Sequence, residues 1–203
     1  MGVSQLNVVF DLGGVVFNWQ PDALIASVFP DPAQQALVHE HVLNHPDWAE
    51  LDRGTLDTTD AITRGALRCG LSEARVGRLL HGVPAALTPI EDTIALIQSL
   101  AGGHHPLYVL SNMHDAATAH LEATNDFWPV FEGCVFSCRV KLIKPEPGIY
   151  RHLLETYDLN PTETVFIDDK AINLDAASQF GIRTIQFADA GQCRTELNAM
   201  GVN

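Results

Sequence analysis

Positive charge is scarce in this sequence. Only 12 of 203 residues are lysine or arginine, against 25 aspartates and glutamates, so the formal net charge is −13. Such an acidic chain is a poor partner for a nucleic-acid backbone or an anionic membrane. It also repels small anions, so a site for a phosphorylated ligand would need its own local cations. The lysines, Lys141, Lys144 and Lys170, all lie in one late stretch.

Long apolar runs and paired cysteines are also missing. No apolar run approaches the roughly 20 residues of a membrane span, and the N-terminal residues lack the pattern of a signal peptide. The four cysteines form no CxxC pair, and Cys134 and Cys138 have a poor spacing for zinc. We therefore expect a cytoplasmic protein with free thiols. The sequence leaves open whether it is a monomer or a homodimer.

Short apolar runs indicate a buried parallel sheet. The chain is 46% hydrophobic and 18% charged, which fits a folded domain with a substantial core. Runs that read as strands buried on both faces lie at 6–10, 107–110, 134–137, 165–167 and 184–187. Helical patterns at 91–100, 147–157 and 171–180 alternate with the later runs. This alternation predicts βαβ units.

Residues 16–88 break that alternation. They contain no convincing strand and predict helices at 21–29, 32–44, 58–69 and 72–81, separated by prolines and glycines. The sequence thus predicts an α/β fold, with a doubly wound, Rossmann-like parallel sheet. Its core would comprise 1–15 and 89–203, and 16–88 would form a helical cap inserted after the first strand.

Polar side chains follow the ends of the predicted strands. Asp11 follows the first run, Ser111 and Asn112 the second, Lys144 lies just past the third, and Asp168 and Asp169 end the fourth. Strand ends of an open parallel sheet form its ligand site. Each cluster alone is a weak signal, because Ser-Asn can begin a helix and Asp-Asp can form a turn. Together they predict a nucleophile, a hydroxyl donor, a cation and a carboxylate pair in one place.

This set of groups suits phosphoryl transfer. Asp11 and Asp169, with Asp168 beside them, offer the oxygen ligands that Mg²⁺ prefers. The metal and Lys144 would offset the repulsion between a carboxylate nucleophile and a phosphate. An aspartyl-phosphate intermediate on Asp11 would then divide one difficult displacement into two.

Groups that donate hydrogen bonds are expected around the phosphate as well. Ser111 and the backbone amides after Asp11 can donate to phosphoryl oxygens. Gly13 and Gly14 would let that backbone approach closely.

Four segments of the chain resemble the motifs of the haloacid dehalogenase superfamily. They are Asp-Leu-Gly-Gly-Val-Val at 11–16, Val-Leu-Ser-Asn at 109–112, Ile-Lys-Pro-Glu-Pro-Gly-Ile-Tyr at 143–150, and Phe-Ile-Asp-Asp at 166–169 followed by Asn173. The pattern is most similar to that of small bacterial phosphatases that act on α-glucose 1-phosphate. It also resembles the phosphatase domain of mammalian soluble epoxide hydrolase.

This resemblance implies a magnesium-dependent phosphatase for a small phosphorylated metabolite, with a sugar phosphate expected. The implied metal ligands are Asp11, the Gly13 carbonyl and Asp169, with Asp168 adjacent. The implied phosphate contacts are Ser111, Asn112 and Lys144.

The sequence departs from the usual phosphatase motif at Gly13. That position ordinarily carries an aspartate that protonates the leaving group and later activates water. Losing such a group costs on the order of a hundred- to ten-thousand-fold in rate. The sugar-1-phosphate phosphatases share this glycine, and an anomeric hydroxyl is a comparatively good leaving group. His114 could replace the aspartate, although a solvated histidine at a helix start is the simpler expectation.

Two other functions fit parts of the pattern. A metal-independent 2-haloacid dehalogenase would use the same aspartate, but Gly13 and the Asp168-Asp169 pair disfavour it. A binding protein that lacks turnover is favoured by Gly13 alone.

Residues of the cap are harder to interpret. Trp19, Phe29 and Trp48 could shape specificity or belong to the core. Arg53 could reach a substrate, or it could lie in a helix–helix turn that needs Gly54.

Overall fold

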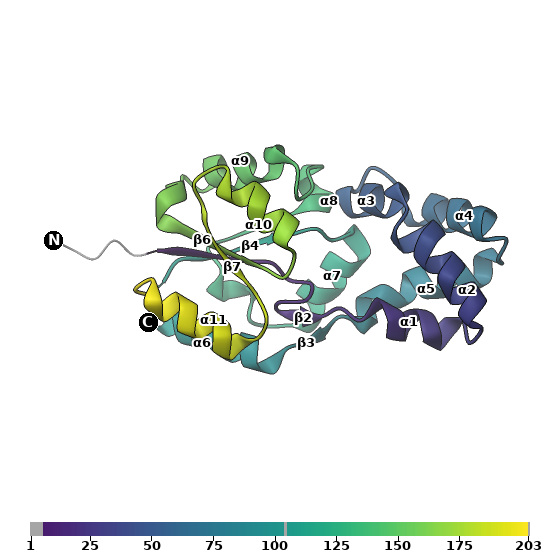
Figure 1. The fold of residues 1–203 in the computed structure, drawn as a ribbon, viewed down its shortest axis with the longest axis horizontal. Helices are drawn as coiled ribbons and strands as arrows, with labels where there is room; N and C mark the ends of the chain where they lie inside the picture. The colour runs from purple at the N-terminus through teal and green to yellow at the C-terminus, as the bar shows by residue number, and fades with distance from the viewer. Residues whose placement is uncertain (1–5, 104, 203) are drawn as a thin grey trace.

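The fold consists of a sheet with helices on both faces and a group of helices beside one end of the sheet (Figure 1). The computed structural model describes residues 6–103 and 105–202. Within these ranges, no helix has both the length and the apolar character that crossing a bilayer would require.

The central sheet is parallel and confirms the predicted fold class. Its strands follow the order β5-β4-β1-β6-β7, with parallel pairing throughout. They are β1 (Asn7–Phe10), β4 (Leu107–Ser111), β5 (Gly133–Phe136), β6 (Thr164–Asp168) and β7 (Arg183–Gln186). Each lies within about one residue of a predicted apolar run. In Figure 1 the carboxyl ends of the strands face the helical group.

Helices cover both faces of this sheet. One apolar cluster joins the sheet to α6 (Glu91–Gly102), α7 (Asp115–Thr124) and α11 (Ala190–Ala199). The other joins it to α9 (Pro147–Thr156) and α10 (Ala171–Ser178). Shorter helical pieces are α8 (Ser137–Val140) and the 3₁₀ turns Trp128–Val130 and Pro161–Glu163.

The sequence did not predict α7 or α11. In α7 the buried side chains are Ala117, Thr118 and Leu121, and in α11 they are Cys193 and Leu197. Such short, partly polar faces give almost no periodic apolar signal.

The helical group, which we call the cap, consists of α1 to α5. These are α1 (Pro21–Val28), α2 (Pro32–Val38), α3 (Pro46–Arg53), α4 (Thr58–Cys69) and α5 (Glu73–Ala86). The cap has an apolar cluster of its own, drawn from residues 24–80. The boundaries 16 and 88 stay a prediction.

The helix predicted at 32–44 was wrong in its length, and α3 was not predicted. The chain leaves the α-helical path at His39–Leu43, where a π-helical turn follows α2. Pro46 then begins α3, and Gly54 in the left-handed conformation ends it.

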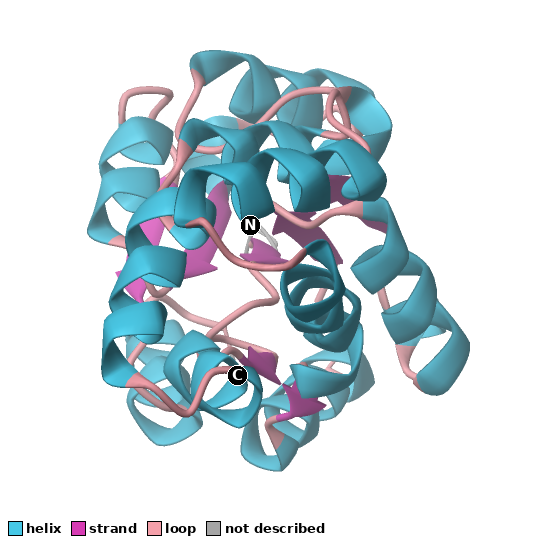
Figure 2. Cartoon of the chain, turned by 90° about the vertical axis from the view of Figure 1, so that its right-hand side faces the viewer, coloured by secondary structure: helices cyan, strands magenta, loops and turns pink. Residues whose placement is uncertain are grey.

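The expectation that 16–88 contains no strand was also wrong. β2 (Phe17–Asn18) pairs antiparallel with β3 (Thr88–Pro89). The chain enters the cap through β2 and leaves it through β3, so both connections lie side by side. Figure 2, seen from the cap side, shows the cap helices in front of the strands. The strand ends therefore lie beneath the cap.

Candidate active site

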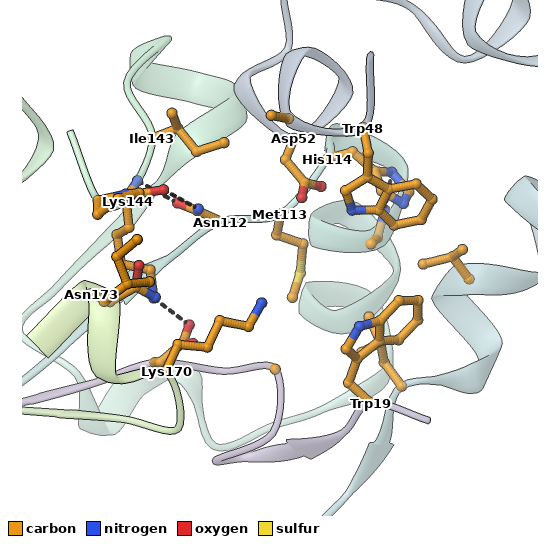
Figure 3. A pocket seen from close by; sticks show the side chains of 18 residues that line it. Trp19, Trp48, Asp52, Asn112, Met113, His114, Ile143, Lys144, Lys170 and Asn173 are labelled. Carbon is orange, nitrogen blue, oxygen red and sulfur yellow. Dashed lines mark hydrogen bonds and ion pairs between the residues drawn. The ribbon is translucent and has the colours of Figure 1, made fainter. Parts of the chain in front are cut away.

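A cavity of about 320 Å³ lies between the strand ends and the cap. Of the predicted site residues, Asp11, Gly13, Asn112 and Lys144 line it, as Figure 3 shows in part. Ser111, Asp168 and Asp169 lie outside its lining. The four strand-end segments thus meet at one place, although only some of their side chains reach the open space.

Lys144 joins two of these segments. Its Nζ lies 2.8 Å from Asp11 Oδ1 and 2.7 Å from Asp168 Oδ2, and its side chain is 1% exposed. Burial disfavours the ammonium charge, but the two carboxylates outweigh it and hold the pKa of Lys144 above its ordinary value. A permanent positive charge therefore lies at the strand ends of this acidic protein.

Asp168 is saturated with hydrogen bonds. Its Oδ1 accepts from the Lys170 amide at 2.8 Å and from Asn173 Nδ2 at 3.1 Å. Its Oδ2 accepts from Lys144 Nζ at 2.7 Å and from Asn173 Nδ2 at 3.0 Å. A carboxylate has about four acceptor positions, so these contacts use them all. Asp168 therefore orients Lys144 and has little capacity left for a metal ion.

Asn112 holds the backbone on the other side of Lys144. Its Nδ2 donates to the Lys144 carbonyl at 2.9 Å, and its Oδ1 accepts from the Lys144 amide at 2.8 Å. Both ends of this side-chain amide are thus engaged. The structure gives Asn112 a positioning contact with Lys144, and its predicted contact with a phosphate stays a prediction.

Asp11 lies at the end of β1 and is buried. Its amide donates to the Ile167 carbonyl at 2.9 Å, and its Oδ1 accepts from the Leu12 amide at 2.7 Å. Burial raises the pKa of Asp11 to about 6, with Lys144 opposing and Asp168 reinforcing the rise. The side chain nevertheless reaches the cavity, as a nucleophile must.

A group of carboxylates beside Asp11 could hold a cation. Among the described residues, one carboxylate oxygen from each of Asp11, Asp168 and Asp169 lies within 4.8 Å of the others. Oδ1 of Asp169 is buried and has no partner among the described residues. Burial, and then the charge of Asp168, raise the pKa of Asp169. An uncompensated buried carboxylate oxygen is costly unless a cation joins it, so the donor set fits a hard metal ion.

Gly14 is required at its position for two reasons. Its φ is +79°, and a Cβ there would lie 2.8 Å from Asp169 Oδ2. The glycine thus lets the Asp11 loop lie against Asp169.

The prediction that the backbone amides after Asp11 donate to a phosphate was partly wrong. The Leu12 amide donates to Asp11 itself, and the Gly14 amide donates to the Phe17 carbonyl at 2.8 Å. These two amides serve the turn after β1 and are not available to a ligand in this structure.

Near the strand ends, two further buried polar atoms lack hydrogen-bond partners among the described residues, and these are Ser111 Oγ and His114 Nε2. Ser111 is fully buried at the end of β4. His114 begins α7, as expected, but it is 4% exposed, so the prediction that it is solvated was wrong. Burial lowers the pKa of His114 to about 4, so its ring is neutral at physiological pH. Its Nδ1 accepts from the Ala117 amide at 3.4 Å, which leaves the proton on Nε2.

Gly13 leaves an open space in the cavity. A Cβ added there would meet nothing within 4 Å. The position where the resemblance would place an acid–base aspartate is therefore sterically free.

The sequence did not identify Asp52 and Lys170 as site residues. Figure 3 shows Asp52 of α3 pointing into the cavity from the cap, while Lys170 points in from the loop before α10. The position of Lys170, next to Asp169 and within the lysine-bearing stretch, was an available signal. For Asp52 there was none beyond its place beside Arg53 and Gly54.

The other cap predictions have mixed outcomes. Trp19 and Trp48 line the cavity, with their ring centroids 6.1 Å apart, whereas Phe29 is fully buried in the apolar cluster of the cap. Arg53 makes two hydrogen bonds to Glu146, of 2.8 and 2.6 Å, and lies outside the cavity lining. The structure therefore supports the interpretation that Arg53 belongs to the turn at Gly54 and does not contact a substrate.

A family model described as haloacid dehalogenase-like hydrolase matches residues 7–181. The sesquiterpene phosphatase astK of Aspergillus oryzae is 25% identical over 182 residues, which are 90% of this chain and 89% of that protein. The (S)-2-haloacid dehalogenase 4A of Burkholderia cepacia is 26% identical over 66% of this chain and 58% of that protein.

Solved structures include a similar fold. A Bacteroides thetaiotaomicron enzyme described as of the HAD family, in complex with magnesium and inorganic phosphate, has a TM-score of 0.73 and 24% identity. The alignment covers 92% of this chain and 96% of that one.

Proposed function

The chain belongs to the haloacid dehalogenase-like hydrolase family, and we propose that it is a magnesium-dependent phosphatase acting on a small phosphorylated metabolite. In this proposal Asp11 attacks phosphorus and forms an aspartyl-phosphate intermediate, which water then hydrolyses.

The observation that carries this proposal is the arrangement around Lys144. A buried ammonium ion is shared by Asp11 and Asp168 at distances of 2.8 and 2.7 Å. It lets a carboxylate nucleophile and a phosphate approach each other within an acidic protein. Asn112 accepts a hydrogen bond from the Lys144 amide, and Asn173 donates one to Asp168. Such preorganisation lowers the cost of stabilising a charged transition state.

The proposed metal ligands are Asp11, the Gly13 carbonyl and Asp169. The partnerless Oδ1 of Asp169 and the grouping of the carboxylates support this assignment. Asp168, whose acceptor positions are used, would support the site through Lys144 and Asn173. When bound, Mg²⁺ supplies positive charge that stabilises negative charge on the phosphoryl oxygens. Ser111 remains a proposed phosphate contact, because its hydroxyl has no partner among the described residues.

The residues that line the cavity indicate which class of leaving group it can hold. The resemblance found in the sequence implies a sugar phosphate, whose hydroxyls need polar partners. The wall beyond the strand ends is largely apolar, with Trp19, Trp48, Val83, Leu87 and Ile172. The similarity to a sesquiterpene phosphatase adds weight to a leaving group with an apolar surface. We therefore propose that both classes be tested and expect the apolar phosphate to bind more tightly.

The second candidate is hydrolysis of a 2-haloacid. The similarity to a haloacid dehalogenase favours it. Oδ1 of Asp169, which has no hydrogen-bond partner in the described part of the chain, disfavours it, because a metal-independent reaction leaves that oxygen without a cation. A binding protein without turnover is the third candidate, which the open space at Gly13 favours.

The test is phosphate release from sugar phosphates and prenyl phosphates, with Mg²⁺ and with a chelator. We expect release with Mg²⁺ only, and a loss of at least about a thousandfold in Asp11→Asn, because the nucleophile is gone. Asp175→Asn, at an exposed position of α10, is the matched control and should keep the wild-type rate.

Two results would contradict the proposal. Chloride release from 2-chloropropionate, unaffected by the chelator, would favour the dehalogenase. Binding of inorganic phosphate without turnover of any compound would favour the binding protein.

A further inference from the structure

The proposed reaction needs a proton for the leaving group and a base for the attacking water, and Gly13 can supply neither. We propose that Asp52, a residue of the cap, is the acid–base catalyst of this site. The inference rests on the proposed phosphatase function and adds a catalytic residue to it.

The position of Asp52 is the first argument. It lines the same cavity as Asp11 and Gly13 but approaches from the opposite side, at the end of α3. In Figure 3 its carboxyl group points into the open space. A phosphate held at the strand ends directs its leaving group away from the sheet and toward the cap. A proton donor for that group must therefore come from the side where Asp52 lies.

The backbone of Asp52 is fixed to the core by one hydroxyl group. Ser137 is fully buried at the start of α8, and its Oγ donates to the Asp52 carbonyl at 2.6 Å. The same Oγ accepts from the Met113 amide at 2.9 Å. Ser137 thus connects the cap to the loop after β4, which bears Asn112, one of the predicted phosphate contacts. This bridge ties the backbone of Asp52 to the loop after β4.

The next two residues fasten the same turn. Gly54 has φ +74°, and a Cβ there would lie 2.7 Å from the Cys138 carbonyl oxygen. Its own carbonyl accepts from Lys141 Nζ at 2.7 Å. Arg53 binds Glu146 through two hydrogen bonds. The turn that bears Asp52 is therefore in contact with the core on several sides, which is what precise placement of a catalytic group requires.

The charge state of Asp52 fits both tasks. Burial raises the pKa of Asp52 to about 7, and the charge of Asp11 adds to the rise. The charge of Lys170 opposes it, as do hydrogen bonds from the His114 backbone and the Trp48 side chain. At neutral pH the group is divided between acid and base, which suits a catalyst that plays both roles in turn. His114, with a pKa of about 4, is neutral there and a poor proton donor.

The proton balance of the two steps is complete. In the first, an Asp11 oxygen bonds to phosphorus, the bond from phosphorus to the leaving oxygen breaks, and that oxygen takes the proton of Asp52. In the second, the Asp52 carboxylate takes a proton from water as the water oxygen bonds to phosphorus. The bond from phosphorus to Asp11 then breaks, which releases inorganic phosphate and restores both aspartates.

The experiment compares Asp52→Asn with the wild type on two substrates in the presence of Mg²⁺. An alkyl phosphate needs a protonated leaving group, whereas p-nitrophenyl phosphate does not. We expect alkyl phosphate hydrolysis to fall by about a hundred- to ten-thousandfold. With p-nitrophenyl phosphate we expect a burst of one nitrophenolate per enzyme and then a slow steady state. A phosphorylated protein should accumulate, because water lacks its base.

Two controls keep a structural effect separate from a chemical one. Asp60→Asn, at an exposed position of α4, should behave as the wild type. Adding Gly13→Asp to the Asp52→Asn variant should raise its rate of alkyl phosphate hydrolysis at least tenfold, since the new side chain has open space. In the wild type, alkyl phosphate hydrolysis should decline above about pH 7, while hydrolysis of p-nitrophenyl phosphate, whose leaving group needs no proton, should not.

The outcomes separate the two proposals. If the wild type releases no phosphate, the proposed function fails, and the role of Asp52 fails with it. If the wild type is active and Asp52→Asn hydrolyses the alkyl phosphate within about threefold of its rate, or shows no burst, only the role of Asp52 is overturned.

Discussion

The two sides of the cavity differ in the kind of residues that line them and in how their charged groups are held. On the sheet side, Asp11, Lys144 and Asp168 are bound to one another by short, buried contacts, and Asn112 and Asn173 hold the ends of the network. On the cap side, the lining is mostly aromatic and aliphatic, and Asp52 is its one carboxylate. On the sheet side the two carboxylates share a buried cation, whereas the Asp52 carboxyl group on the cap side takes no part in these ion pairs, and burial raises its pKa to about 7.

This difference assigns a task to each side. A network in which each charge has a partner is preorganised to stabilise a phosphate. A lone carboxyl group whose pKa is raised by burial can donate and accept a proton. The sheet side therefore suits binding and attack, and the cap side suits proton transfer and the choice of leaving group.

Removing the central cation should have the largest effect on stability. Lys144→Met leaves Asp11 and Asp168 buried together without their shared partner. We expect a loss of about 3–5 kcal/mol in the free energy of unfolding, measured by urea denaturation, together with loss of turnover. Lys141→Met, which removes one exposed hydrogen bond to Gly54, should cost less than about 1 kcal/mol. Equal losses for the two variants would show that the buried contacts of Lys144 stabilise the fold no more than an exposed hydrogen bond does.

On the cap side, Asp52 should make the free energy of unfolding depend on pH. The pKa of Asp52 is raised on folding, from 3.8 to about 7, so the folded state holds more protons than the unfolded state between these values. Stability should therefore fall as pH rises through this window. Asp52→Asn removes that contribution, so its stability relative to the wild type should increase between pH 5 and pH 8, by on the order of 2 kcal/mol.

Urea denaturation of both proteins at the two pH values, in the presence of a chelator, measures this change. Asp60→Asn should leave the pH dependence of the wild type unaltered. A constant difference between Asp52→Asn and the wild type would mean that Asp52 has an ordinary pKa.

The smallest expected effect concerns the ion pair that joins the two sides. The Arg53 and Glu146 side chains are 17% and 50% exposed, so a double-mutant cycle with Arg53→Met and Glu146→Gln should give a coupling below about 1 kcal/mol. The same variants should slow alkyl phosphate hydrolysis several-fold, because they loosen the turn that bears Asp52. The exposed pair Arg139–Glu122, which joins α8 to α7 and does not involve the cap, should give a similar coupling energy without that loss of rate.

The sheet side could be predicted from the sequence because its logic is local. Each of its residues follows a short apolar run, and parallel strands bring their carboxyl ends together whatever the loops between them do. Asp11, Asn112, Lys144 and Asp168 were therefore recognisable. Their exact partners were not, since a linear sequence does not show that Asn112 would be used on the Lys144 backbone.

The cap side could not be predicted in the same way. Asp52 lies in a helix that the sequence did not reveal, and its place depends on a hydroxyl group 85 residues away in Ser137. Its raised pKa follows from burial in the assembled cavity. The solvated state expected of His114 failed for the same reason, because the helices that bury it are distant in the chain.

The place of β1 between β4 and β6 in the sheet has a consequence for the order of events during synthesis. β1 leaves the ribosome early, but its two neighbours in the sheet begin only at Leu107 and Thr164. The apolar cluster of the cap is drawn from residues 24–80, so its side chains can be buried together first. β1, bearing the future nucleophile, must wait with its apolar surface uncovered until the later strands arrive.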